Sequence, residues 1–354
     1  MTIEGDNRVG DPAGIERDAV TAWMAERVDI VGALRFSLIA GGHSNLTFSV
    51  TDDGGQHWVL RRPPLGHVLA TAHDMGREHR IISALATTPI PVAPVVGFCD
   101  DPAVNGAPFY VMQFVEGTVV RDEETAGSLS VAQRTNASES LVDVLAAIHA
   151  TDVEAVGLGD LGRHDGYIER QLNRWYRQYQ GSKEMTDKVD FTAVDQVHDH
   201  LLGRIPLQQG TAIVHGDYRL DNCMLAADGS VSAVLDWEIC TLGDPLADLG
   251  LLWVYWTDPG QAAALPQASP TALEGFMRRD EIVARYEEAS GRDLSAIDFY
   301  IAFGYWKLTC IIAGVYARYA AGAMGDVDHR QVDGFATMVS ALATLASDAA
   351  SKVS

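Results

Sequence analysis

Basic residues are scarce in this sequence. It carries 26 Lys and Arg against 48 Asp and Glu, a formal net charge of −22 over 354 residues. A surface of this sign repels the phosphates of nucleic acids and the headgroups of anionic lipids. We therefore expect no nucleic-acid partner and no membrane partner. Lysine is missing altogether before Lys183, so any cationic role earlier in the chain must fall to arginine.

Cysteine and long apolar runs are scarce as well. The four cysteines lie far apart and form no Cys-x-x-Cys pair, which argues against a disulfide framework or a thiolate zinc site. The first ten residues, MTIEGDNRVG, contain no apolar run of the signal-peptide kind. The most apolar late stretch, near 308–324, follows Lys307 and contains Arg318, so it predicts a buried helix rather than a membrane span. Together these features predict a soluble, cytoplasmic protein.

What the chain does have is 47% hydrophobic residues, enough for a large core without crosslinks. The early pattern predicts a helix over 11–27, begun by Asp11 and Pro12, and a helix over 73–86. A hairpin turning near Asn105-Gly106 should follow. The β-type runs before the second helix are residues 36–40, 46–51 and 57–62. Five strands and one inserted helix are thus expected in the first 115 residues.

After Gly117 the pattern changes to long helices. Apolar residues recur at helical spacing over 137–149 and 167–180, and the chain from about 271 is again helical. Between them come a strand-like run, TAIVHGD, and a short hairpin that turns at Asp228-Gly229. The pattern predicts an α+β protein.

The segment 214–248 carries the chemistry. His215-Gly216-Asp217 is followed by Asn222, five residues after Asp217, and by Asp236 inside the run VLDWE. Phosphoryl transfer needs a carboxylate that orients and deprotonates a hydroxyl, and hard oxygen ligands for Mg²⁺. Asp217 is therefore the candidate base, with Asn222 and Asp236 as candidate magnesium ligands. Single tripeptides such as HGD arise by chance, but three coupled pieces behind a five-strand lobe do so far less often.

The order HGDxxxxN, LDWE and GDPxxDL resembles the aminoglycoside phosphotransferase and choline kinase superfamily, relatives of protein kinases. The motifs GGxSN and VLRRPP are similar to a subgroup whose members occur alone in bacteria or fused to acyl-CoA dehydrogenase domains. The resemblance spans nearly the whole chain. It implies a two-lobed protein-kinase-like fold, with a five-stranded antiparallel nucleotide-binding lobe over 1–115. A mostly helical lobe over 116–354 would hold the catalytic loop and the acceptor pocket.

The resemblance also implies a small-molecule kinase that uses ATP and Mg²⁺. Protein kinases hold the α- and β-phosphates with a lysine on the third strand, paired with a helix glutamate. Here the resemblance places Arg61 in that role, paired with Glu78, and Arg62 is the alternative. Arginine keeps the charge but changes the geometry. The remaining nucleotide-binding candidates are Gly42, Ser44 and Asn45 over the phosphates, and Val59, Met112, Gln113 and Val115 around the adenine.

Four residues near the motif have a structural or an open role. His215 and Asp248 are expected to hold the catalytic loop by analogy with the family. Asp244 is either a further ligand or a helix cap, and we favour the cap. Glu238 would share a strand face with Asp236, so that it could reach a second metal or the substrate, and a solvated carboxylate is the alternative.

The acceptor is expected to be a small hydroxylated metabolite, with a hydroxyacyl compound or its CoA thioester suggested by the subgroup. Arg219 could bind an acidic acceptor or the γ-phosphate, or pair with Asp221. Aromatic residues are more often core than pocket. The further candidate walls are Tyr218, Trp237, Trp253, Tyr255, Trp256, Tyr305 and Trp306. The choice between ATP and GTP and the oligomeric state stay open.

Two other functions remain alternatives. A non-catalytic nucleotide-binding pseudokinase is supported only by the arginine that replaces the lysine. A metal-dependent phosphoester hydrolase would use the carboxylates of Asp217, Asp236 and Asp244 with His215, but the chain lacks the HxH and HExxH spacing of such sites.

Overall fold

The computed structural model describes residues 12–39, 45–66, 74–183, 191–261, 269–320 and 329–353. The chain forms two units, and the first is not continuous in sequence. The first unit contains Met1–Val119, Cys223–Ala227 and Val231–Glu238. The second contains Val120–Asn222, Asp228–Ser230 and Ile239–Ser354. The chain therefore leaves the first unit, enters the second, and later returns to the first.

The first unit is built on a five-stranded antiparallel sheet in the order β1-β2-β3-β5-β4. Its strands are β1 (Arg35–Leu38), β2 (Leu46–Thr51), β3 (His57–Arg62), β4 (Val95–Cys99) and β5 (Phe109–Gln113). Its helices are α1 (Arg17–Ala25), α2 (Met75–Leu85) and α3 (Pro102–Asn105). The expected five strands are present.

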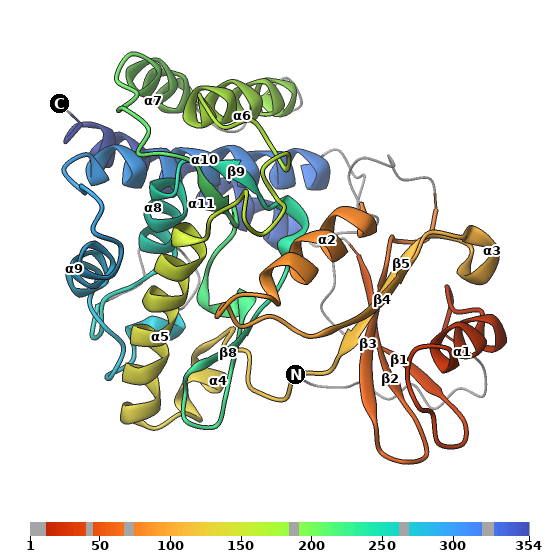
Figure 1. Cartoon of the computed structure of the whole chain (residues 1–354). Coiled ribbons are helices and arrows are strands. Elements are labelled where there is room, and N and C mark those ends of the chain that lie inside the picture. The colour runs from red at the N-terminus through yellow and green to blue at the C-terminus, as the bar shows by residue number, and fades with distance from the viewer. Residues whose placement is uncertain are drawn as a thin grey trace. The chain divides into compact units, whose positions relative to one another are not determined.

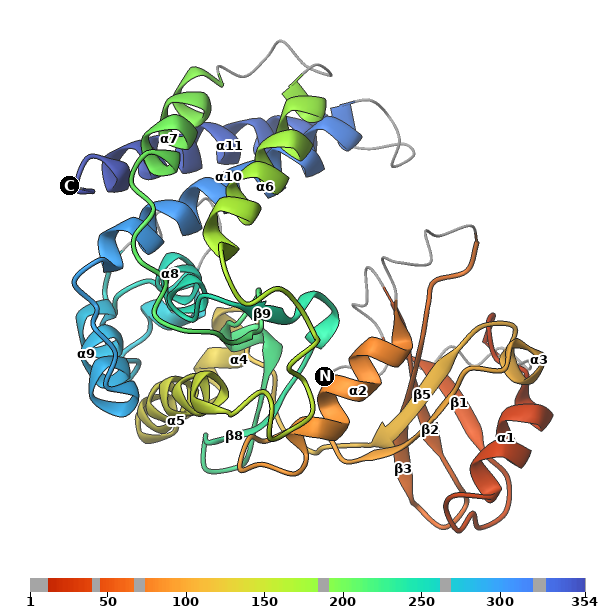
Figure 2. The same ribbon diagram turned by 45° about the horizontal axis from the view of Figure 1, so that its top comes forward.

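Alternation along the strands gives the sheet two different faces. Phe48, Leu60 and Val111 lie side by side in register and form a buried core with α1. The residues between them, including Arg61 and Tyr110, point to the opposite face, which α2 covers. Figures 1 and 2 show α1 on one side of the sheet and α2 on the other. The apolar face stabilises the sheet and leaves the other face free for polar groups.

Two early expectations differ from the structure. The helix predicted over 11–27 is α1, which begins only at Arg17. Pro12 therefore precedes the helix, and Asp11 lies outside the described residues. Near Asn105 the chain forms the short helix α3 instead of a simple turn. Asp101 caps α3 by accepting from the amide of Ala103, and Gly106 ends it with a φ of +70°.

A hairpin from late in the chain completes the first unit. Its strands β7 (Cys223–Leu225) and β8 (Val231–Val234) pair antiparallel, and the turn falls at the expected place. Leu225 bridges to Thr118, and the amide of Val234 donates to the carbonyl of Pro91 at 2.8 Å. These backbone bonds attach the hairpin to the segment that follows the sheet, and the hairpin leads directly into Asp236.

The second unit is mostly helical. Its helices are α4 (Glu123–Gly127), α5 (Val131–Ala150), α6 (Tyr167–Lys183), α7 (Thr192–Leu202), α8 (Leu246–Tyr255), α9 (Arg279–Ser290), α10 (Ile297–Ala320) and α11 (His329–Ala350). The 3-10 turns are η1 (Leu220–Asn222), η2 (Trp237–Ile239, which begins in the first unit) and η3 (Pro270–Ala272). The strands β6 (Ala212–Val214) and β9 (Thr241–Gly243) form a short antiparallel pair. The helices predicted over 137–149 and 167–180 lie within α5 and α6.

Helix α10 is the centre of the second unit, packed against α6, α8 and α11. Among the described helices, it is the one whose length and composition would suit a membrane span. However, 83% of its most apolar window is buried inside the protein. The burial is that of a core helix, as the sequence predicts.

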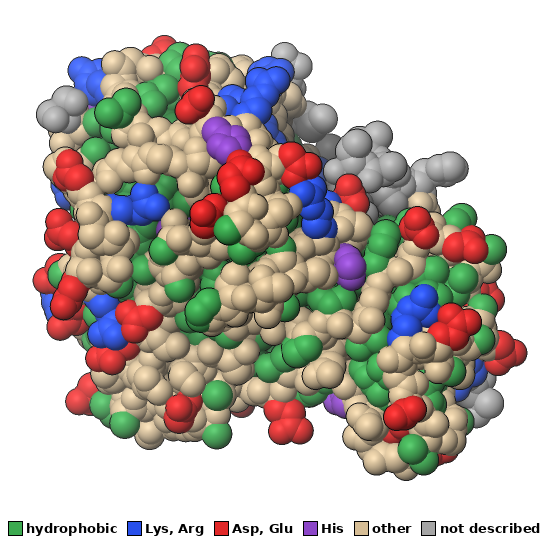
Figure 3. Space-filling model, viewed as in Figure 1, with side chains coloured by type: hydrophobic (Ala, Val, Ile, Leu, Met, Phe, Trp, Pro, Cys, Tyr) green, Lys and Arg blue, Asp and Glu red, His purple; other side chains and the backbone are tan. Residues whose placement is uncertain are grey.

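The acidic side chains are dispersed on the face that Figure 3 shows. In the space-filling view, Asp and Glu side chains are scattered over the visible face of each unit and do not gather in one patch (Figure 3). On this face, therefore, no single acidic patch marks a binding surface.

Candidate active site

The first unit holds a buried cluster of charges around Arg61. Arg61 points from β3 toward α2, where its Nη1 lies 3.3 Å from Oε1 of Glu78. Its Nη2 lies 3.3 Å from Oδ1 of Asp236. The side chains of Arg61 and Glu78 are 12% and 1% exposed, whereas that of Asp236 is 37% exposed. The expected pair of Arg61 with Glu78 is present, and Asp236 extends it toward solvent.

Burial and neighbouring charges act in opposite directions on the pKa values of this cluster. Burial raises the pKa of Glu78, and the nearby charge of Arg61 opposes that rise. Burial is also the largest single influence on Arg61 and disfavours its charge, but the nearby acidic groups, Glu78 foremost, together outweigh burial and raise the arginine pKa. Arg61 is therefore a permanent cation, fixed in position by a carboxylate beneath it.

Arg62, the alternative to Arg61, has a structural role. It lies on the opposite face of the sheet and is 6% exposed. Its Nη1 donates to the carbonyls of Gly14 and Asn105. Its charge thus holds together the segments around α1 and α3, which leaves Arg61 as the cation of the cluster.

Asp236 has an unusual backbone. Its φ is +61°, the one positive φ of a residue other than glycine in the described chain. Such a conformation costs free energy and is concentrated at functional sites. Strand β8 ends at Val234 and η2 begins at Trp237. The expectation that Asp236 and Glu238 share a strand face is therefore wrong, because the chain turns between them.

Glu238 is held by the first unit. Its Oε2 accepts from Nδ2 of Asn45 at 3.1 Å, and Asn45 is 2% exposed. Asn45 thus contacts a residue of the LDWE motif. The other two candidates of the glycine-bearing hairpin, Gly42 and Ser44, lie outside the described residues.

The candidate adenine-binding residues occupy adjacent strands. Val59 and Met112 are paired in register on the face that carries Arg61. The amide of Gln113 already donates to the carbonyl of Pro94 at 2.8 Å. The next amide, of Phe114, donates to His57. The first backbone amide in this segment beyond these two bonds is that of Val115, which is half-buried.

The second unit holds the catalytic loop, directly after β6. Nδ2 of Asn222 donates to the carbonyl oxygen of Asp217 at 2.9 Å and to its Oδ2 at 3.0 Å. The amide of Asp217 donates to Nδ1 of His215 at 3.3 Å. His215 is fully buried, so its contacts are those of a loop-holding residue. The sequence spacing thus brings Asp217 and Asn222 into direct contact.

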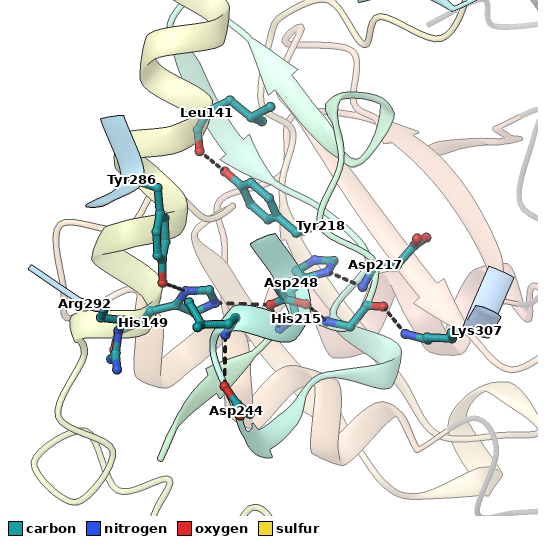
Figure 4. A network of polar contacts seen from close by, with 12 residues as sticks. Leu141, His149, His215, Asp217, Tyr218, Asp244, Asp248, Tyr286, Arg292 and Lys307 are labelled. Atoms are coloured by element: carbon teal, nitrogen blue, oxygen red, sulfur yellow. Dashed lines mark hydrogen bonds and ion pairs between the residues drawn. The ribbon is translucent and has the colours of Figure 1, made fainter. Parts of the chain in front are cut away.

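Asp248, on α8, anchors the backbone of this loop. Its two carboxylate oxygens accept from the amides of His215 at 2.7 Å and Gly216 at 2.8 Å (Figure 4). Burial favours its protonated form, but the hydrogen bond from His149 and the amides outweigh burial, and the pKa of Asp248 is lowered. The expected tie between Asp248 and the loop is present.

His149 was not predicted from the sequence. Its Nε2 lies 3.3 Å from Oδ2 of Asp248, and its Nδ1 lies 2.7 Å from the hydroxyl of Tyr286. Because a carboxylate only accepts, Nε2 carries the proton and Nδ1 accepts from Tyr286. Burial lowers the pKa of His149, which keeps it neutral. Its carbonyl accepts from Arg292. The sequence feature that could have indicated it is a histidine on the apolar side of a predicted helix.

Arg219 lies beside the candidate base. Its Nε is 3.4 Å from Oδ2 of Asp217 and 2.9 Å from Oδ1 of Asp221. Its guanidinium carbon lies 4.7 Å from the ring centroid of Tyr255, a cation–π contact. Burial raises the pKa of Asp221. Arg219 thus pairs with both carboxylates rather than with Asp221 alone.

Most of the candidate acceptor walls are core residues. The fully or almost fully buried ones are Tyr218, Trp237, Trp256, Tyr305 and Trp306. Four of these five donate to a backbone carbonyl inside the protein. Trp253 and Tyr255, at the end of α8, are only half-buried. Of the proposed walls, these two and Arg219 keep surface that a ligand could contact.

The side chain of Asp244 is bonded within the protein, next to the start of α8. It is fully buried. Its Oδ1 accepts from the amide of Leu246 at 3.2 Å, and its Oδ2 accepts from the hydroxyl of Tyr300 at 2.7 Å. Burial raises the pKa of Asp244. Two of the groups that the hydrolase alternative needs, Asp244 and His215, are therefore enclosed in the protein.

Comparisons with a family model and with solved structures point to the same protein family. Residues 35–298 match the family model described as the phosphotransferase enzyme family. The structure of a putative aminoglycoside phosphotransferase from Ralstonia eutropha is 34% identical, with a TM-score of 0.80, and the match covers 95% of this chain and 98% of that one. A second solved structure is a ternary complex of streptomycin, ATP and an aminoglycoside phosphotransferase, with a TM-score of 0.57 at 14% identity. The match covers 86% of this chain and 91% of that one, and at this identity it shows the fold alone.

A curated relative is longer than this chain. Acyl-CoA dehydrogenase family member 11 of Gallus gallus is 34% identical over 320 residues. The match covers 88% of this chain and 40% of the chicken protein. The family match extends over most of the sequence, and a solved relative matches nearly end to end. This chain belongs to the phosphotransferase enzyme family, with its kinase-like fold, and is a small-molecule kinase.

Proposed function

We propose that the protein transfers the γ-phosphate of ATP to a hydroxyl of a small molecule in a Mg²⁺-dependent reaction. The observation that carries this proposal is the contact of the Asn222 amide with the carboxylate of Asp217, on a loop that follows β6 in a member of the phosphotransferase family. The relative solved with ATP and streptomycin supports ATP as the phosphate donor.

Asp217 is the base in this proposal. Its side chain is 29% exposed, so a hydroxyl can reach it. Asn222 orients the carboxylate through Oδ2, and Asp248 fixes the backbone before it. Asp217 accepts the proton of the acceptor hydroxyl as the oxygen attacks the γ-phosphate.

Asn222 and Asp236 have suitable groups for Mg²⁺. Because Nδ2 of Asn222 is used by Asp217, its Oδ1 is the atom left for a ligand. Arg61 contacts Oδ1 of Asp236, and the carboxylate is partly exposed. Both are hard oxygen donors. In sites of this kind Mg²⁺ is bound by one or two carboxylates together with substrate phosphates. Bound magnesium would neutralise charge on the phosphates.

The nucleotide would be held by groups of the first unit. Arg61, fixed by Glu78, would bind the α- and β-phosphates. Gly42, Ser44 and Asn45 would cover the phosphates. Val59 and Met112 would contact the adenine. Because the amide of Gln113 is used within the protein, the backbone of Val115 is the better partner for the adenine edge.

For the acceptor, we propose a hydroxyacyl compound or another hydroxylated metabolite. The name of the chicken relative, an acyl-CoA dehydrogenase family member, supports an acyl compound. Trp253 and Tyr255 offer apolar surface, and Arg219 offers a cation beside the base.

An ADP-release screen tests the function. The panel contains hydroxyacyl compounds, their CoA thioesters, other hydroxylated metabolites and aminoglycosides, each with ATP and Mg²⁺. We expect ADP release with at least one hydroxylated acceptor, and formation of its phosphate ester. Binding of Mg·ATP without transfer to any of them would favour the pseudokinase. Hydrolysis of phosphoesters that needs no ATP would favour the hydrolase.

A magnesium titration tests the metal ligands. Asp236→Ala should abolish Mg²⁺-dependent nucleotide binding, because it removes the carboxylate proposed as ligand. Isothermal titration with ADP at increasing Mg²⁺ measures this, with Asp228→Ala, in the exposed hairpin turn, as the matched control. An unchanged magnesium dependence in the Asp236 variant would remove Asp236 from the metal site.

A further inference from the structure

Helix α10 carries a lysine where its surroundings are apolar. Lys307 is 5% exposed and lies between Trp306 and Leu308, which are also buried. Burial lowers the pKa of Lys307. Burying an ammonium group is costly, and an apolar side chain of similar size at such a place is often neutral or stabilising. Core packing therefore does not explain this lysine.

The ammonium of Lys307 is directed at the catalytic loop. Its Nζ donates to the carbonyl of Gly216 at 2.9 Å (Figure 4). It also lies 5.8 Å from the ring centroid of Trp175, on α6. Asp248 and Asp217 attract its charge, and Arg174 repels it. The contact brings a residue late in the chain to the peptide just before the candidate base.

Gly216 has a backbone conformation that favours glycine. Its φ is +87°, and an added Cβ would lie 3.1 Å from the side chain of Ile239. Its amide is held by Oδ1 of Asp248 at 2.8 Å, and its carbonyl is held by Lys307. That carbonyl belongs to the peptide that joins Gly216 to Asp217. Fixing it therefore fixes the direction in which the backbone enters Asp217.

We propose that Lys307 is a positioning residue for phosphoryl transfer. By holding the carbonyl of Gly216, it keeps the peptide before Asp217 in one orientation and so aims the carboxylate. Lys307 acts through Gly216 and does not touch the reacting atoms. The proposal rests on the proposed function, in which Asp217 is the base.

Lys307→Met tests the proposal, because methionine keeps much of the stem and removes the ammonium. ADP release from Mg·ATP, with water as the acceptor, should fall on the order of 10²-fold, the cost of a small misplacement of a catalytic group. The dissociation constant for Mg·ADP should stay at the wild-type value. The unfolding free energy should be unchanged or higher. The matched control is Lys352→Met, since Lys352 is exposed near the end of the described chain, and it should match wild type in all three.

Amide exchange gives a readout that does not depend on turnover. The peptide over 214–222 should exchange faster in Lys307→Met than in wild type or in Lys352→Met. Wild-type exchange in Lys307→Met would overturn the proposal, and so would wild-type turnover. If the wild-type protein releases no ADP with water or with any acceptor of the screen, the proposed function fails, while the exchange data still decide whether Lys307 holds the loop.

A rescue experiment covers a methionine variant that fails to fold. Lys307→Ala leaves space for a small amine. If the ammonium positions the loop, added propylammonium should raise the turnover of this variant at least about tenfold. It should also slow exchange of the 214–222 peptide. Failure of propylammonium to change either quantity in folded Lys307→Ala would overturn the proposal.

Discussion

The two units hold their functional groups in different ways. In the first unit, side chain supports side chain: Glu78 holds Arg61, which in turn contacts Asp236. In the second unit, side chains support the main chain. Asp248 accepts hydrogen bonds from the two amides before Asp217, and Lys307 donates one to the carbonyl of Gly216. The first arrangement fixes a charge, and the second fixes the path of a loop.

The difference follows from what each group has to do. A cation that binds phosphate must be present and charged, and a buried carboxylate beneath it ensures both. A base must be aimed within a fraction of an ångström, which depends on the backbone that carries it. Loss of Glu78 should therefore mainly lower the unfolding free energy, whereas loss of a contact to the loop should mainly lower turnover.

The largest effect should come from the base itself. Asp217→Ala should lower turnover by roughly 10²–10⁴-fold, the usual contribution of a general base. Nucleotide affinity should persist, because the proposed phosphate and adenine contacts belong to the first unit. ADP-release kinetics and ADP titration measure the two effects. Turnover near that of wild type would show that Asp217 is not the base and would break the comparison.

Glu78→Leu should be the most destabilising change in the first unit. It leaves the buried Arg61 with the partly exposed Asp236 as its nearest described carboxylate. Removing one partner of a buried ion pair costs about 3–5 kcal/mol of unfolding free energy. Adding Arg61→Met should recover much of that stability while nucleotide affinity stays low. Urea denaturation of wild type, the two single variants and the double variant measures these unfolding free energies.

The matched control is the exposed pair of Arg285 with Asp143, which are 33% and 50% exposed. Asp143→Ala should cost about 1 kcal/mol or less. Equal losses in Asp143→Ala and Glu78→Leu would mean that burial of the Arg61 pair has no special weight.

Asp248→Asn should cost less stability than Glu78→Leu. An asparagine offers one carbonyl oxygen to two amides, so one charge-assisted hydrogen bond, worth about 1.5–3 kcal/mol, is lost. Turnover should fall together with stability because the loop loses an anchor. Asp348→Asn, the same change on an exposed part of α11, should leave both unchanged. An Asp248 variant with wild-type turnover would contradict the view that backbone support matters here.

The smallest effect should be a pH dependence of stability. The folded protein lowers the pKa of His149 from 6.5 because the ring is buried. Well above pH 6.5 neither state binds this proton, and the full contribution of the neutral His149 to stability is present. As the pH falls below that value the unfolded chain binds the proton first, so the unfolding free energy decreases. Urea denaturation between acidic and neutral pH should show this slope.

His149→Gln should flatten the slope. The control is His79→Gln, because burial lowers the pKa of His79 in the first unit as well, although His79 is only half-buried. The His149 variant should lose more of the slope than the His79 variant. The opposite ranking would contradict the assignment of a neutral, buried His149.

Sequence patterns predicted the local parts of this structure well. Alternation along β3 places Arg61 and Arg62 on opposite faces, and the spacing from Asp217 to Asn222 is short enough for one loop to fix their contact. The backbone reversal at Asp236 was missed, because β-type neighbours hide a residue with a positive φ.

Long-range contacts could not be predicted in this way. His149 meets Asp248 across 99 residues, and Lys307 meets Gly216 across 91. Each lies in an apolar helix, where its local pattern is that of an ordinary core segment. Only packing of that helix against the loop gives the side chain its role, and packing is not encoded in the spacing of any one segment.

The return of β7 and β8 to the first unit has a consequence for dissecting the protein. A fragment that stops at Val119 contains the sheet and Arg61 but lacks Asp236. A fragment that starts at Val120 carries two strands whose backbone partners, Thr118 and Pro91, are left behind. No single cut in the gene yields both units whole. Joining the termini by circular permutation would not help, because the two units alternate along the chain. A copy of the hairpin segment joined to the first 119 residues would be needed to separate nucleotide binding from the catalytic loop.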